Sequence, residues 1–183
     1  AIVETSRRRF ERVYTDCYAA VLRYCLRRTN REDALDATAE TFLVAWRRMS
    51  DLPAGRELPW LYGVAFRVLA NQRRASARRA AALPRLRGVV DAPGRGQPEL
   101  VVLQGEESAG LVAALDRLSP SDQELIRLAG WEELDRYALA LAVGCTANAA
   151  TKRLNRALDR LGRELGVPDR VRGRFFRRKK VAS

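Results

Sequence analysis

The chain has 183 residues, with 34 lysines and arginines against 22 acidic residues, and its net charge is +12. With 47% hydrophobic residues it can form one medium domain or two small ones, so overall disorder is excluded. No stretch approaches the roughly eighteen apolar residues of a membrane span, and residues 1–14 lack the apolar core of a signal peptide. We therefore expect no membrane insertion and a cytoplasmic location.

The chain contains no histidine and only three scattered cysteines, Cys17, Cys25 and Cys145. This excludes a Cys/His zinc site and a disulfide framework, and we interpret the cysteines as small core residues. The carboxylates are dispersed and no glycine-rich loop precedes a helix, so we expect no enzyme activity, no metal and no cofactor.

Residues 7–82 are predicted to form three successive helices. The first covers about 7–29 and the second about 32–49, and a Pro53-Ala54-Gly55 break precedes the third, which begins near Trp60. On the second helix, the side chains expected to face the core are Leu35, Ala39, Phe42, Leu43 and Trp46. Together the three helices can bury a small core.

The third helix leads into the most basic part of the chain, because residues 60–87 contain seven arginines and no acid. Its predicted apolar stripe is Trp60, Leu61, Val64, Ala65, Val68 and Leu69. The polar positions off the stripe are Arg67, Asn71, Arg73, Arg74, Arg78 and Arg79. Guanidinium groups suit phosphates and guanine edges, and an amide can read a base, so nucleic acid is the expected partner. The alternative is a solvated basic helix face.

From Leu83 to about Gly105 the helical pattern is lost among three prolines and four glycines, which predicts an extended linker. Helical periodicity then returns, and Ser119-Pro120 is expected to begin a helix with Ser119 as its N-cap. No β-hairpin signal appears, so we expect an all-α chain.

Residues 139–165 have the spacing of a helix-turn-helix, with Gly144 at the turn and Thr146 capping the second helix. The predicted buried side of that helix is Leu154, Leu158, Leu161 and Leu165, and its polar side is Asn148, Thr151, Lys152, Asn155, Arg156 and Arg160. These amides, hydroxyls and cations suit a major groove. An ordinary helical bundle with a polar outer face is the alternative.

The order of these parts resembles the extracytoplasmic-function sigma factors, a branch of the sigma-70 family. The segments FERVYTDCYAAVLRYCLRRT, EDALDATAETFLVAWRRM and WLYGVAFRVLANQRR are similar to successive regions of the second domain of that family. The segment LDRLSPSDQELIRLAGWEELDRYALALAVGCTANAATKRLNRALDRL is similar to its fourth domain. The resemblance implies two small helical domains, residues 1–82 and 108–166, with a linker over 83–107 and a basic tail over 167–183.

Carried over by position, the resemblance implies three functional surfaces. Core RNA polymerase would be contacted through Asp36, Glu40, Thr41 and Arg47. The −10 element would be contacted through Arg67, Asn71, Arg78, Arg79 and a loop containing Arg73, Arg74, Ala75 and Ser76. The −35 element would be contacted through Asn148, Thr151, Lys152, Arg153, Asn155 and Arg156.

The expected partners are core RNA polymerase, promoter DNA and an anti-sigma protein. The apolar run 137–140 departs from the more acidic pattern of the family and is expected either to meet the anti-sigma protein or to pack internally. Two other functions remain open, a helix-turn-helix repressor acting alone and a basic protein that coats RNA. The basic tail is expected either to attract phosphate or to be a disordered solubilising segment.

Overall fold

A computed structural model of the chain describes residues 2–82 and 106–167. Helices are the only regular secondary structure in these two ranges, so the predicted all-α class is confirmed. The chain divides into two compact units between Leu100 and Val101. The predicted linker, from residue 83 to 105, and the basic tail from residue 168 lie outside the described residues.

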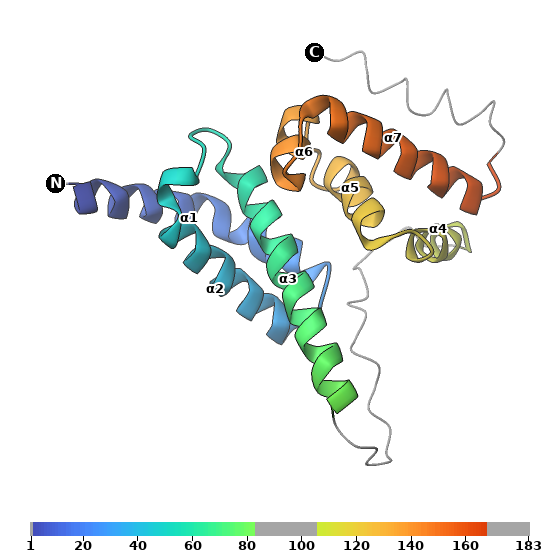
Figure 1. Cartoon of the computed structure of the whole chain (residues 1–183), viewed down its shortest axis with the longest axis horizontal. Helices are drawn as coiled ribbons and strands as arrows, with labels where there is room; N and C mark the ends of the chain where they lie inside the picture. Colours follow the sequence, from blue (N-terminus) through green and yellow to red (C-terminus); the bar gives the residue numbers. More distant parts are fainter. Residues whose placement is uncertain (1, 83–105, 168–183) are drawn as a thin grey trace. The chain divides into compact units, whose positions relative to one another are not determined.

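The first unit is a three-helix assembly of α1 (Ile2–Leu26), α2 (Arg31–Arg47) and α3 (Glu57–Ala82), with a single 3₁₀ turn, η1 (Met49–Asp51), after α2. Each of the three helices packs against the other two (Figure 1). The start of α2 is fixed by Asn30, whose side-chain oxygen accepts a hydrogen bond from the Asp33 amide at 2.9 Å. These helices form a core in which the Tyr24 and Tyr62 rings stack 4.8 Å apart.

The inward face of α2 differs from the prediction. The buried residues are Ala34, Ala37, Thr38, Thr41, Phe42 and Ala45. Of the five residues predicted to face the core, only Phe42 is buried, and Leu35, Ala39, Leu43 and Trp46 are exposed. Small side chains let α2 approach α1 and α3 closely, and the two buried threonine hydroxyls donate to backbone carbonyls of the preceding turn at 2.7 Å. Three of the large apolar side chains of α2, Leu35, Leu43 and Trp46, therefore lie on the outer face.

The third helix ends at Ala82, in agreement with the predicted helical range 7–82, but it includes a segment that the resemblance implies to be a loop. Residues 73–76, which the resemblance implies to be a loop, lie within α3, and the helix continues to Ala82. This correction follows from composition, because arginine and alanine, which dominate residues 73–82, are among the strongest helix formers. The core contribution of α3 ends earlier, since no residue from Ala70 to Ala81 is buried.

The second unit contains α4 (Glu106–Asp116), α5 (Pro120–Gly130), α6 (Arg136–Val143) and α7 (Ala147–Glu164). Helix α4 begins inside the segment expected to be linker. The predicted caps are confirmed, because the Ser119 side chain accepts from the Asp122 amide and the Thr146 side chain accepts from the Ala149 amide. Gly144 ends α6 in the left-handed conformation, with φ 69° and ψ 44°.

The core of the second unit includes Ala114, Leu115, Leu118 and Leu161, with Leu111 and Ile126 packed against them. The buried face of α7 differs from the predicted row of leucines. Leu154 and Leu158 are half-buried and Leu165 is 40% exposed, whereas Ala150 and Ala157 are fully buried. As in α2, alanines line the closest helix contact.

The cysteines have no partner in a disulfide, and Cys17 and Cys25 are buried as predicted, whereas Cys145 is half-buried. Among the described helices, none has the length and apolarity that crossing a membrane requires.

Candidate nucleic-acid interface

The basic face of α3 begins opposite its buried face. Leu61, Val64, Ala65, Val68 and Leu69 are buried and Trp60 is half-buried, close to the predicted stripe. The predicted polar residues Arg67, Asn71, Arg73, Arg74, Arg78 and Arg79 are all exposed, and Ser76 is half-buried. Arg67 therefore lies on the half of α3 that packs against the core, and Arg73, Arg74, Arg78 and Arg79 lie beyond the last buried residue, Leu69.

The arginines of α3 differ in what they bind within the protein. Arg73 donates from Nη2 to the carbonyl oxygen of Arg28 at 2.8 Å, which ties α3 to the connection between α1 and α2. Arg79 donates to the Ser76 hydroxyl oxygen at 3.1 Å. Arg74 donates from Nη2 to Oδ1 of Asn71.

A straight row of four exposed residues remains on one side of α3, comprising Arg67, Asn71, Arg74 and Arg78. Their spacing of four, three and four residues places them on one helix face. We call this set the α3 row. Eleven residues separate its ends, which corresponds to about 16 Å along the helix. A strand backbone lying along this face would meet a cation at each end and an amide–guanidinium pair between them.

The second basic helix is α7. All six residues predicted for the −35 element are exposed, namely Asn148, Thr151, Lys152, Arg153, Asn155 and Arg156. The left-handed Gly144 and the Thr146 cap fix the point at which this helix starts. The first two turns of α7 therefore present donors and acceptors to solvent, as a helix must do to enter a major groove.

Arg160 lies farther along α7 and has a different role from the one its polar position suggests. Its guanidinium forms an ion pair with the Asp122 carboxylate of α5 at 2.5 Å. Asp122 is only 8% exposed, whereas the Arg160 side chain is 49% exposed, so this contact fastens α7 to α5 at the edge of the core. Arg160 therefore stabilises the packing of α7 on α5, which holds the six exposed residues in place.

The outer face of α2 combines charge with exposed apolar side chains. Asp36, Glu40 and Arg47, which the resemblance assigns to polymerase contact, are exposed. Around them, Leu35 is 42% exposed, Leu43 46% and Trp46 42%. We call the apolar part of this face, Leu35, Leu43 and Trp46, the α2 ridge. Thr41 lies on the opposite side, fully buried, so its assignment to a polymerase-facing surface is corrected to helix packing.

An aromatic cluster lies beside the α2 ridge, and the sequence analysis did not predict that it would be exposed. Phe10 lies 5.2 Å from Trp46 and Tyr14 lies 4.8 Å from Phe42, between ring centroids. Tyr14 is 41% exposed. Phe10, Tyr14 and Tyr18 recur every four residues in the sequence, a spacing that places them on one helix face but does not distinguish a core face from an exposed one. Exposed aromatic residues in a rigid cluster are the side chains that most often dominate protein interfaces.

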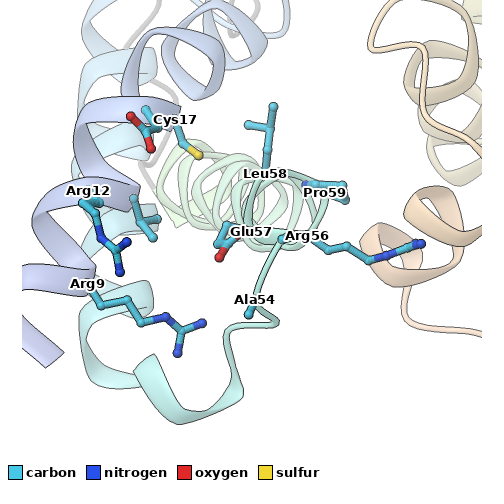
Figure 2. A pocket seen from close by; sticks show the side chains of 11 residues that line it. Arg9, Arg12, Cys17, Ala54, Arg56, Glu57, Leu58 and Pro59 are labelled. Carbon is cyan, nitrogen blue, oxygen red and sulfur yellow. The ribbon is translucent and has the colours of Figure 1, made fainter. Parts of the chain in front are cut away.

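A cavity of about 410 Å³ lies between α1 and the start of α3 (Figure 2). Arg9 and Arg12 line it from α1, and Glu57 lines it from α3. Burial, followed by the charges of Glu57 and Asp16, raises the pKa of the Cys17 thiol at its wall. That thiol stays protonated at neutral pH and is a poor nucleophile. Within the described residues, no group of three or more Cys, Asp or Glu side chains could bind a metal ion.

Comparison with known proteins gives no matching family model. The RNA polymerase sigma factor NccH of Alcaligenes xylosoxydans xylosoxydans is 27% identical over 135 residues, covering 70% of this chain and 71% of that protein. The predicted resemblance to the sigma factors is confirmed by this relative.

Two solved structures share the fold. The sigma factor RpoE, in complex with the anti-sigma factor NepR from Bartonella quintana, aligns with a TM-score of 0.58 and 20% identity, over 86% of this chain and 97% of that one. CnrH, in complex with the cytosolic domain of CnrY, aligns with a TM-score of 0.53 and 18% identity, over 89% of this chain and 91% of that one. This chain therefore shares its fold with the sigma factor RpoE and with CnrH.

Proposed function

We propose that this chain is a sigma factor that binds core RNA polymerase and directs it to two-part promoters, with α7 contacting the −35 element and α3 the −10 element. The observation that carries the proposal is the presence of two outward-facing basic helices, each packed on its own helical unit. The similarity to NccH over 135 residues supports the same role. A protein acting with polymerase would work in the cytoplasm.

In this proposal the two helices read different forms of DNA. The α7 residues suit direct readout of duplex edges in the major groove. The exposed end of α3 suits a separated strand, whose phosphates can follow the row of cations while a base meets Asn71. Contacts to one strand favour the melted state over the duplex, which is how binding would contribute to promoter opening.

The α2 ridge is the proposed contact with polymerase. Apolar and aromatic residues rimmed by Asp36, Glu40 and Arg47 have the composition of a protein interface with a dry centre and a charged edge. An anti-sigma protein is the second proposed partner, because RpoE and CnrH were both solved as complexes, with NepR and the cytosolic domain of CnrY. Tyr137 is 49% exposed and packs against the Arg136 guanidinium at the surface, while Ala138, Leu139 and Ala140 are buried and pack internally.

The test is reconstitution with core polymerase. We expect the full chain to form a complex with core and to open promoter DNA that core alone leaves closed. Leu43→Glu should weaken core binding by at least tenfold, because a charge would replace an apolar contact at the centre of the interface. Leu165→Glu is the matched control, since Leu165 has similar exposure on the other unit.

Two outcomes would contradict the proposal. A palindromic footprint produced by the free chain would favour the repressor, and binding without sequence preference would favour an RNA-coating protein. Equal core affinity of the Leu43→Glu and Leu165→Glu variants would remove the α2 ridge from the interface.

A further inference from the structure

The hydrogen bond between Arg74 and Asn71 determines what Asn71 can offer a base. The Asn71 side chain has one acceptor oxygen and one amino group with two donors. Arg74 donates to Oδ1, and because a guanidinium has no acceptor, the amide cannot be turned to place its nitrogen there. The donors of Asn71 must therefore point away from Arg74.

The neighbouring charges reinforce this arrangement. Oδ1 keeps a second lone pair, but an amino group that approached it would compete with the cationic guanidinium that already donates to the same oxygen. Among the described residues, no hydrogen bond or ion pair involves Arg67 or Arg78, the cations at the two ends of the α3 row. These two remain available for phosphates while the central pair faces the base.

We propose that Asn71 and Arg74 form an all-donor reader that selects a keto base, guanine or thymine, and disfavours adenine. This inference rests on the proposed function. An asparagine that recognises adenine uses its oxygen and its nitrogen together, to accept from N6 and donate to N7. With Oδ1 already accepting from the cationic Arg74, that bidentate contact is weakened. Guanine, by contrast, offers O6 and N7 as adjacent acceptors to two neighbouring donors.

The test uses holoenzyme, assembled from the full chain and core polymerase, on a promoter library randomised across the −10 element. The wild type should show one position at which guanine or thymine is enriched and adenine depleted. Arg74→Met frees Oδ1, so adenine use at that position should rise at least fivefold relative to guanine, within the range expected for one bidentate base contact.

Arg79→Met is the matched control. It removes the same charge from the same helix, but Arg79 is bonded to Ser76 and not to Asn71. This variant should reduce use of all promoters alike and leave the base profile unchanged. Asn71→Asp provides an independent check, because its carboxylate offers only acceptors and should shift the preference toward the amino bases adenine and cytosine.

The outcomes separate the inference from the proposed function. If the wild-type holoenzyme initiates but Arg74→Met retains the wild-type profile, the all-donor reader is wrong and the sigma-factor proposal stands. A wild-type preference for adenine at the position altered by Asn71→Asp would also overturn it. If core and chain together open no promoter in the library, the proposed function fails and the inference fails with it.

Discussion

The two basic helices are supported in opposite ways. Helix α7 is capped by Thr146, follows a left-handed Gly144 and is fastened to α5 by the Arg160–Asp122 pair, so its DNA-facing side is fixed from both ends. The buried side chains of α3 end at Leu69. Residues 70–76 are exposed or half-buried, with Arg73 bonded to the Arg28 carbonyl, and residues 77–81 are exposed throughout. A fixed helix suits the rigid edges of duplex DNA, whereas a projecting helix suits a strand whose path is less regular.

The largest expected difference between α7 and α3 is in the stability lost when a proline is introduced into each helix. Arg153→Pro in the middle of α7 should destabilise the second unit by about 3 kcal/mol or more, because proline removes a helix hydrogen bond and clashes with the preceding turn. Ala77→Pro near the end of α3 should change the unfolding of the first unit by less than about 1 kcal/mol, since the unwound turns contribute little to the core. Urea unfolding followed separately in each unit measures both.

The same Ala77→Pro variant also tests whether the end of α3 takes part in promoter opening. Ala77→Pro should weaken promoter opening although the first unit remains folded, because Arg78 and Arg79 would leave the helix. Loss of stability in the first unit comparable to that of Arg153→Pro in the second would show that the end of α3 is packed.

The Arg160–Asp122 pair should provide the next largest effect. Arg160→Met should destabilise the second unit by about 2 kcal/mol, because the nearly buried Asp122 carboxylate loses its charged partner. Arg156→Met, on the exposed side of the same helix, is the control and should change stability by less than about 0.5 kcal/mol. Equal thermal shifts for the two variants would show that the ion pair does not fasten α7.

The cap of α7 should have a smaller effect. Thr146→Ala should cost about 1 kcal/mol, because the Ala149 amide loses its side-chain acceptor, and Thr146→Ser should restore most of it. Chemical denaturation of the second unit provides the measurement. A serine variant as unstable as the alanine variant would place the contribution of Thr146 in its methyl group.

Salt dependence should give the smallest and most specific difference within α3. Replacing both Arg78 and Arg79 with alanine should lower the slope of log affinity against log salt by about one for each phosphate contact that is lost. Binding of holoenzyme to promoter DNA across a salt series measures it. An unchanged slope would place both side chains away from the phosphates.

The features predicted correctly from sequence are those specified by local chemistry. Ser119, Gly144 and Thr146 were identifiable because caps and left-handed turns depend on one residue and its nearest amides. The apolar stripe of α3 was identifiable because its apolar residues repeat at helical spacing, and the same residues are the buried ones in the structure.

The features that sequence reasoning missed depend on how closely helices approach. In α2 the small residues Ala34, Ala37 and Ala45 form the contact and leave Leu43 and Trp46 outside, so ranking by side-chain size selected the wrong face. The assignment of Thr41 to an outer surface failed for the same reason. The Arg73 and Arg74 contacts, to the carbonyl of Arg28 and to Asn71, require coordinates, because sequence alone gives an arginine no preferred acceptor.

The central claim, that one chain carries two independent promoter readers, is tested most directly by transcription from libraries randomised separately in the −35 and −10 elements. With holoenzyme, Asn155→Ala should change which −35 sequences are used and leave the −10 profile intact, and Asn71→Ala should do the reverse. Identical −35 profiles for Asn155→Ala and the wild type, or a −10 profile unaffected by Asn71→Ala, would contradict the account.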